Sequence, residues 1–300
     1  MTQRLTPTAA LLLTIPPVLW AGNAVLGRVI SPMVSPMTLN LLRWTFAFVL
    51  LLPLASGVLR RDSPLWAQWR RFTFLGLLST SGYNALLYLA LNTSTPINVT
   101  LVGASTPVWM LLIGRIIFGQ RISARQTLGA VLSIAGVVLV LCRGQWPLLL
   151  GLHLVAGDLY MLLSSMGWAY YSWMLAHPTA ESASLRVDWA AFLMGQIVFG
   201  LGWSLLFAGA EWALTDARLQ WSWPLLAALL FIALGPALMA YRAWGAGVSR
   251  AGAVVAGFFI NLTPLFTALL SSAFLGEVPQ AFHAMAFFLI VSGIVLSSRR

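Results

Sequence analysis

Two stretches of this chain align without a gap when the sequence is shifted by 157 residues. They are PINVTLVGASTPVWMLLIGRIIFG at residues 96–119 and AVVAGFFINLTPLFTALLSSAFLG at residues 253–276. The same shift superposes several distinctive residues: Thr106-Pro107 on Thr263-Pro264, Gly119 on Gly276, Gly136 on Gly293 and Arg143 on Arg300. Matches of Leu or Ala arise by chance in an apolar chain, but a Thr-Pro pair with flanking glycines is harder to obtain that way. We therefore infer that a unit of about half the chain has been duplicated.

The composition excludes a water-soluble protein. Of the 300 residues, 60% are apolar and 8% are charged, and the mean hydropathy is +0.88. A soluble domain carries about 25% charged residues, and a chain with so few charges cannot cover a water-exposed surface. Because a membrane-spanning helix needs about 20 apolar residues, we expect an integral membrane protein.

Ten apolar runs of suitable length follow one another, separated by short loops. Their expected bounds are Thr8–Ile30, Met37–Leu59, Phe72–Thr93, Asn98–Phe118, Thr127–Cys142, Val155–Ala176, Val187–Gly209, Trp223–Gly245, Ala251–Leu275 and Ala284–Ser298. The pattern predicts an all-α membrane protein with ten transmembrane helices. A cleavable signal peptide is the alternative for the first run, but that run is long for such a role and further spans follow at once.

The charges are lopsided. All 17 basic residues are arginines, against 7 acids, and the net charge is +10. In a soluble protein this balance would indicate nucleic-acid binding, but here the arginines lie between apolar runs, where they set the orientation in the membrane. With a cytoplasmic N-terminus, the inner segments carry eleven arginines and the outer loops three. We expect a multi-pass inner-membrane protein with both termini cytoplasmic and no nucleic-acid partner.

The duplication divides the chain into residues 1–146 and 147–300, with five expected helices in each part. Because five is odd, the second copy enters the membrane with the opposite orientation, which gives two inverted five-helix repeats. Inverted repeats are a recurring device of secondary transporters, since two half-molecules of one fold can open a central site to each side in turn. The sequence therefore predicts transport by alternating access.

Several short motifs strengthen this interpretation. They are Val18-Leu19-Trp20-Ala21-Gly22-Asn23, Ser35-Pro36, Asn40-Leu41-Leu42-Arg43-Trp44, Thr106-Pro107 with Gly119, and Asn261-Leu262-Thr263-Pro264 with Gly276-Glu277. Together they resemble the EamA-type drug/metabolite transporters over nearly the whole chain. The resemblance implies a ten-helix carrier that exports or exchanges small metabolites, often amino acids, and the aromatic content is similar to that of YddG-type exporters of aromatic amino acids. One departure is Gln120, where the first copy in the family usually carries Glu.

Nothing in the sequence favours catalysis. It contains no His-Glu-x-x-His, Gly-x-Ser-x-Gly or Asp-rich motif, and its three histidines, His153, His177 and His283, are scattered over separate loops. The single Cys142 excludes an internal disulfide. We expect a transporter and not an enzyme, without cofactor or metal, whose partners are a small-molecule substrate and membrane lipid, and which acts as a monomer.

Polar groups inside a membrane are costly and therefore mark candidate sites. Trp20 and Asn23 share a face of the first helix, and Asn84 and Tyr88 share a face of the third. We predict a central substrate cavity lined by Trp20, Asn23, Arg43, Tyr83, Asn84, Tyr88, Trp168, Tyr171, Tyr241, Trp244 and Asn261. For each residue taken singly, an interfacial or helix-packing role is the alternative.

Apolar walls with few polar anchors suit amino acids with aromatic or large apolar side chains. A carrier of phosphorylated metabolites or sugar nucleotides is one alternative, but it would need several convergent cations, and only Arg43 and Arg242 lie at depth. An intramembrane lipid-modifying enzyme is the alternative outside transport. The seven acids lie in loops or near span ends, with Asp158 the deepest, and we expect no obligatory proton coupling.

Overall fold

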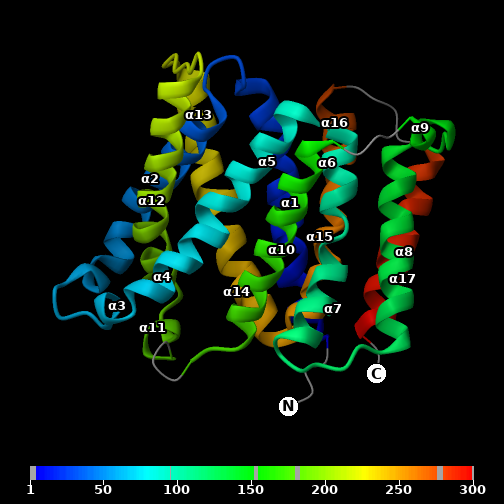
Figure 1. Ribbon diagram of the computed structural model, residues 1–300, viewed down its shortest axis with the longest axis horizontal. Coiled ribbons are helices and arrows are strands. Elements are labelled where there is room, and N and C mark those ends of the chain that lie inside the picture. The colour runs from blue at the N-terminus through cyan, green and yellow to red at the C-terminus, as the bar shows by residue number, and fades with distance from the viewer. Residues whose placement is uncertain (1–4, 95, 152–154, 180–182, 276–279, 299–300) are drawn as a thin grey trace.

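A computed structural model describes residues 5–94, 96–151, 155–179, 183–275 and 280–298, and this part of the chain is all helical apart from one isolated bridge between Val34 and Leu219 (Figure 1). The first half contains α1 (Pro7–Ile30), α2 (Pro36–Ala55), η1 (Ser56–Leu59), α3 (Pro64–Ala67), α4 (Trp69–Gly76), η2 (Leu77–Ser81), α5 (Gly82–Thr93), α6 (Pro96–Gly103), α7 (Thr106–Ile116) and α8 (Ala124–Leu141). The second half contains α9 (Pro147–Leu150), α10 (Ala156–Ala176), α11 (Ala183–Val187), α12 (Trp189–Leu214), α13 (Trp223–Ile232), η3 (Ala233–Met239), α14 (Ala240–Ala251), α15 (Ala253–Ile260), α16 (Leu262–Leu275) and α17 (Ala281–Ser298).

The described residues include nine helical stretches that are long and apolar enough to cross a membrane, and the protein is a multi-pass membrane protein. The expected sixth span, α10, is long enough at 21 residues, but its serines, tyrosines and Asp158 make it less apolar than the nine.

Two of the expected helix ends are wrong. The seventh helix continues past Gly209 to Leu214, and the eighth continues past Gly245 to Ala251. The seventh can do so because the carboxylate of Glu211 is satisfied by backbone N–H groups of α2.

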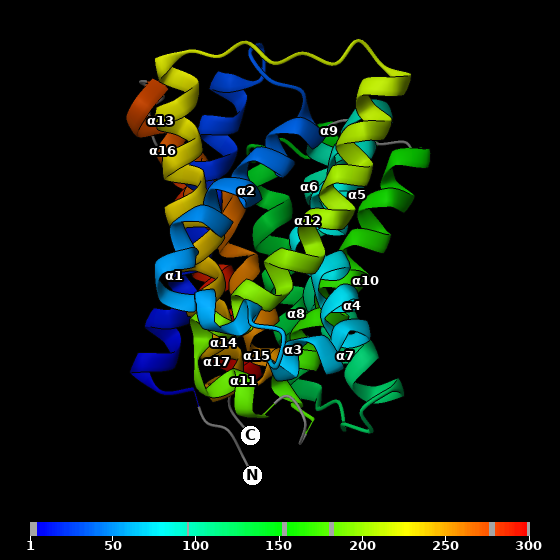
Figure 2. The same ribbon diagram turned by 90° about the vertical axis from the view of Figure 1, so that its left-hand side faces the viewer.

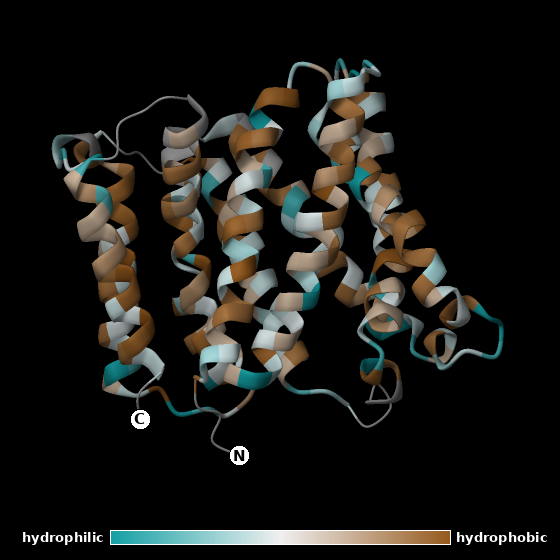
Figure 3. Cartoon of the chain, turned by 180° about the vertical axis from the view of Figure 1, so that it is seen from behind, coloured by the Kyte–Doolittle hydropathy of each residue, from teal (hydrophilic) through white to brown (hydrophobic). Residues whose placement is uncertain are grey.

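Both chain ends lie at the same end of the bundle, together with α3, α11 and the connection from α7 to α8 (Figures 1 and 2). We call this the arginine-rich end, because its segments carry Arg60, Arg61, Arg121 and Arg186. The short helix α9 and the beginning of α13 lie at the opposite end. Figure 3 shows apolar residues along the helices and hydrophilic residues concentrated in the connections between them, as expected for helices that face lipid.

Two pairs of helices are interrupted at matching places. The segment α6–α7 breaks at Ala104 and Ser105, and α15–α16 breaks at Asn261, which is related to Ala104 by the 157-residue shift. Proline explains both breaks, because Pro107 and Pro264 lack an N–H and their rings clash with the carbonyl four residues earlier. In the same way η2, at residues 77–81, corresponds to residues 234–238 inside η3, and both are π-helical turns within longer helices.

The helices α8 and α17 pack along each other at one side of the bundle (Figure 1), and glycines set their approach. A Cβ atom on Gly129 would lie 2.7 Å from the carbonyl oxygen of Gly293, and one on Gly136 would lie 2.9 Å from the carbonyl oxygen of Ala286. The 157-residue shift takes Gly129 to Ala286 and Gly136 to Gly293. The two contacts are therefore reciprocal, as they are where a two-fold axis relates two helices.

This packing predicts that Gly129→Ala lowers the free energy of unfolding by roughly 1–3 kcal/mol, since the added methyl group must push α8 and α17 apart. The matched control is Gly202→Ala in α12, where nothing lies within 4 Å of the new Cβ. That change should be neutral or stabilise by up to about 1 kcal/mol through helix propensity. Thermal unfolding of the purified variants in detergent measures both, and equal melting temperatures would contradict the packing argument.

Candidate functional site

Seven aromatic side chains from five helices meet inside the bundle. We call them the aromatic cluster: Trp20 of α1, Trp44 of α2, Tyr83 of α5, Trp168 and Tyr171 of α10, and Tyr241 and Trp244 of α14. Trp168 is central to it, since its ring centroid lies 5.2–5.7 Å from those of five others: Trp20, Tyr83, Tyr171, Tyr241 and Trp244. The structure thus brings together six of the residues that the sequence nominated and adds Trp44, whose ring centroid is 5.0 Å from that of Tyr241.

Hydrogen bonds fix the orientation of three members of the aromatic cluster. Trp20 Nε1 donates to the carbonyl of Pro236 at 3.2 Å, inside the irregular turn η3. Trp244 Nε1 donates to Ser172 Oγ at 3.2 Å, and Tyr241 Oη donates to the carbonyl of Ser79 in η2 at 2.7 Å. The two π-helical turns therefore supply carbonyl acceptors to the cluster, which links the helix irregularities to the candidate site.

Two indole groups of the aromatic cluster, and the guanidinium group of the adjacent Arg43, carry a nitrogen without a hydrogen-bond partner among the described residues. Trp168 Nε1, Trp44 Nε1 and Arg43 Nε are buried and make no hydrogen bond among the described residues. All three atoms are donors, so the group that would satisfy them is an acceptor. A buried donor left unsatisfied costs about 1–3 kcal/mol, and more when it is charged.

Arg43, in α2, is a buried cation. Its side chain is 4% exposed, and its guanidinium carbon lies 5.2 Å from the centroid of the Trp44 ring. Within the described ranges no carboxylate forms an ion pair or hydrogen bond with it. Since burying an unpaired charge is strongly unfavourable, Arg43 is suited to receive an anionic group from a ligand.

Asn84 belongs to a polar network beside the aromatic cluster. Its Nδ2 donates to Asn40 Oδ1 at 2.9 Å, and Asn40 Nδ2 donates to Ser204 Oγ at 3.2 Å and to the carbonyl of Thr80 at 3.1 Å. These bonds tie α2 and α12 to η2 and α5. The side-chain amide nitrogen of Asn84 therefore helps to hold helices together, a role that the sequence left open as an alternative.

Asn261 connects the two helix breaks. Its Nδ2 donates to the carbonyl of Ala104 at 3.3 Å and to Ser133 Oγ at 2.9 Å. The carbonyl of Ala104 is free to accept because Val108 N donates to Ser105 instead. Asn261 thus stabilises the crossing of the broken helices.

Of the other nominated residues, Asn23 is half-buried without a hydrogen bond in the described structure, and the side chain of Tyr88 lies outside the described residues.

A cavity of about 470 Å³ adjoins the aromatic cluster at Tyr83, and we call it the α5 cavity. It is lined mainly by α5, α10 and α12: Met37, Leu77, Leu78, Gly82, Tyr83, Ala85, Leu86, Leu89, Leu163, Ser164, Gly167, Phe207, Ala210, Glu211, Leu214 and Thr215. Leu214 and Thr215 lie where α12 ends, so the cavity extends from Tyr83 toward the end of the bundle opposite the arginine-rich end. Its size is that of a pocket for a small organic ligand.

The two acids nearest to the membrane interior are occupied as helix caps. Asp158 accepts hydrogen bonds from Val155 N and from the hydroxyl of Ser94 at the start of α10. Glu211 accepts from Met37 N and Thr38 N, each at 2.9 Å, at the start of α2. Carboxylates are stabilised at helix N-termini, and both side chains are held there by these hydrogen bonds. Glu277 lies outside the described residues.

Basic residues surround the arginine-rich end but do not join the aromatic cluster. Arg242 is exposed, and its guanidinium carbon lies 4.5 Å from the centroid of the Trp189 ring. In α11, burial lowers the pKa of Arg186, the nearby charge of Arg71 lowers it further, and Tyr171 opposes this shift. The bundle therefore carries positive charge between Tyr171 and the arginine-rich end.

Comparison with known proteins agrees with this architecture. Residues 7–142 and 155–299 each match the model of the EamA-like transporter family. An uncharacterised transporter, YyaM of Bacillus subtilis (strain 168), is 25% identical over 76% of this chain and 72% of its own. The aromatic amino acid exporter YddG of Ancylobacter novellus is 23% identical over 81% of this chain and 78% of its own. A crystal structure shares the fold at a TM-score of 0.75 and 22% identity, covering 97% of this chain and 96% of that one.

Proposed function

Because the chain belongs to the EamA-like transporter family, we propose that it carries amino acids with aromatic or large apolar side chains across the inner membrane by alternating access. The family consists of transporters, so the intramembrane lipid-modifying enzyme is excluded and the open question is the substrate. A relative named as an exporter of aromatic amino acids agrees with the proposal.

The observation that carries the proposal is the aromatic cluster with its unsatisfied donors. A carboxylate would accept from Arg43 Nε and from the indole N–H groups of Trp44 and Trp168, which have no partner in the described protein. The same rings offer edges and faces to an aromatic or bulky side chain. An α-amino acid with such a side chain combines both features in one small molecule.

Phosphorylated metabolites and sugar nucleotides fit less well. A phosphate brings up to two negative charges, and Arg43 is the cation that the described structure buries beside the aromatic cluster. Arg242, the second candidate cation, is exposed and packs on Trp189. One buried guanidinium matches one carboxylate better than it matches a phosphate.

Alternating access requires two related halves, and we assign these to residues 1–146 and 147–300 as inverted repeats of five spans each. The assignment is supported by the breaks at Ala104 and Asn261, by the turns η2 and η3, and by the reciprocal glycine contacts of α8 and α17. In this scheme α10 is the sixth span in chain order, and it brings the number of spans from nine to ten. It is less apolar because its inner face contributes Trp168 and Tyr171 to the site.

The substrate is tested by counterflow of the twenty amino acids in proteoliposomes. We expect exchange of phenylalanine, tyrosine, tryptophan or leucine above the others. Trp168→Ala should weaken the apparent affinity for these about tenfold, the equivalent of 1.4 kcal/mol, because it removes the central ring. Trp221→Ala is the control, since Trp221 is 59% exposed and lies in the connection before α13. If Trp168→Ala transports normally while expression is unchanged, the substrate binds elsewhere.

The orientation is tested by cysteine labelling in a background that lacks Cys142. We expect a cysteine at position 66, beside Arg60 and Arg61, to react only with reagent on the cytoplasmic side, because loops rich in arginine stay inside. A cysteine at position 221 should react from outside. Labelling of position 66 by an impermeant external reagent would reverse the assignment.

The roles of the acidic residues indicate how transport is driven. Asp158 and Glu211 hold helix N-termini, and the first-copy position that corresponds to Glu277 is the neutral Gln120. We therefore expect facilitated transport or exchange without obligatory proton coupling. Uptake into proteoliposomes with and without an imposed pH gradient measures this. Accumulation above equilibrium that disappears with the gradient, and also in Glu277→Gln, would show the opposite.

A further inference from the structure

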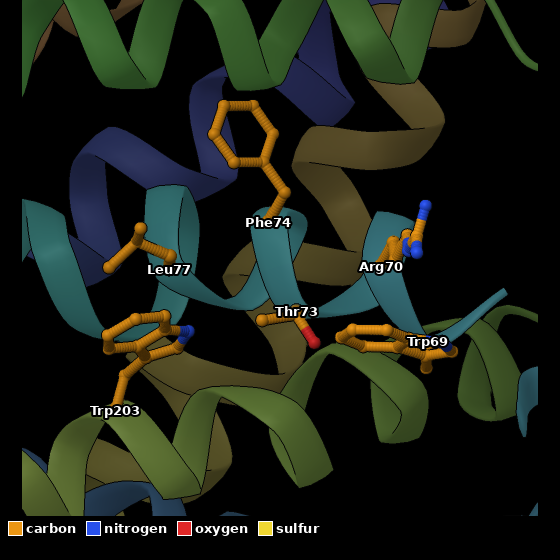
Figure 4. A pocket seen from close by; sticks show the side chains of 6 residues that line it. All are labelled: Trp69, Arg70, Thr73, Phe74, Leu77 and Trp203. Carbon is orange, nitrogen blue, oxygen red and sulfur yellow. The ribbon is translucent and has the colours of Figure 1, made fainter.

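We propose that a groove between α4 and α12 binds an anionic phospholipid whose headgroup lies at the arginine-rich end. The groove has a volume of about 260 Å³, and none of its lining residues belongs to the aromatic cluster. Figure 4 shows the side chains that line it. Six residues line it, and we call it the α4 groove: Trp69, Arg70, Thr73, Phe74 and Leu77 from α4 and η2, and Trp203 from α12.

The walls of the α4 groove are suited to an acyl chain. Trp69 is 51% exposed and Phe74 is 42% exposed, so large apolar surfaces face outward from the bundle. Figure 4 shows the indoles of Trp69 and Trp203 on the same side of α4 with Thr73 between them. In a bilayer such a surface is covered by lipid, and tryptophans gather at the level of the headgroups.

The charge at the mouth of the α4 groove selects the headgroup. The guanidinium carbon of Arg70 lies 5.4 Å from the centroid of the Trp69 ring, which holds the charge beside the interfacial indole. Residues 56–81 contain four arginines and one aspartate. Basic pockets between membrane helices recognise anionic headgroups. The complement is therefore a negatively charged phospholipid, and not a zwitterionic one.

Leu77 separates the α4 groove from the α5 cavity. It lines both the α4 groove and the α5 cavity, and it begins the π-helical turn η2. A lipid chain in the groove would therefore pack against the wall of the cavity, beside the turn that accepts the hydrogen bond of Tyr241.

The test is native mass spectrometry of the delipidated full-length protein with phosphatidylglycerol or phosphatidylcholine of the same acyl chains. We expect one phosphatidylglycerol to be retained in preference to phosphatidylcholine, and Arg70→Gln to reduce this preference about fivefold, the effect of one interfacial arginine. Arg121→Gln is the control, because Arg121 is an exposed arginine at the same end that does not line the groove.

Trp203→Ala separates the two parts of the site, since it should weaken retention of both lipids equally while leaving their ratio unchanged. Three results would overturn the proposal. They are equal retention of the two lipids by the unmodified protein, an equal loss in Arg121→Gln and Arg70→Gln, and displacement of phosphatidylglycerol by inorganic phosphate alone, which would indicate a plain anion site.

Discussion

A bilayer supplies no water to hydrogen-bond a buried polar group, and most of this structure meets that constraint from within. The carbonyl of Ala104, freed by a proline-induced break, accepts from Asn261. The carbonyl of Ser79, in the turn η2, accepts from Tyr241. The carboxylates of Asp158 and Glu211 are satisfied by helix N-termini. Several buried side-chain atoms of the described residues still lack a partner, among them Ser165 Oγ and Asn261 Oδ1. The donors of Arg43, Trp44 and Trp168 are also in this group, and we propose that a substrate carboxylate satisfies these three.

The irregular turns in the helices provide carbonyl groups that accept hydrogen bonds from side chains. Regular helices satisfy their own backbone and leave little for a ligand or a neighbouring helix. The π-helical turns η2 and η3 instead offer carbonyls to Tyr241 and Trp20, and so position the aromatic cluster from both halves of the chain. The broken helices α6–α7 and α15–α16 meet through Asn261. Transporters commonly place discontinuous helices at the substrate site, and the same pieces here occur in pairs related by 157 residues.

Sequence reasoning could find the helices and the family, because both depend on local composition and on motifs that are contiguous in the chain. It also nominated Trp20, Tyr83 and Trp168, since an aromatic residue within a span stands out. It did not nominate Trp44 or Asn40, although they flank Arg43, because their roles depend on Tyr241 and Ser204, which lie far away in the sequence. The same holds for Glu211, whose partners in α2 let α12 extend beyond the expected end.

In the proposed mode of binding, Arg43 and the aromatic cluster hold the carboxylate and the side chain of one amino acid. Equilibrium binding of L-phenylalanine and of phenethylamine, which lacks the carboxylate, tests it in the purified protein and in Arg43→Gln. We expect the unmodified protein to prefer L-phenylalanine by about tenfold or more, as for a buried charge-assisted hydrogen bond of 1.5–3 kcal/mol. In Arg43→Gln the preference should fall to about twofold or less, because L-phenylalanine loses its carboxylate partner while phenethylamine, itself a cation, is not weakened. An unchanged preference for L-phenylalanine in Arg43→Gln would show that Arg43 does not bind the carboxylate.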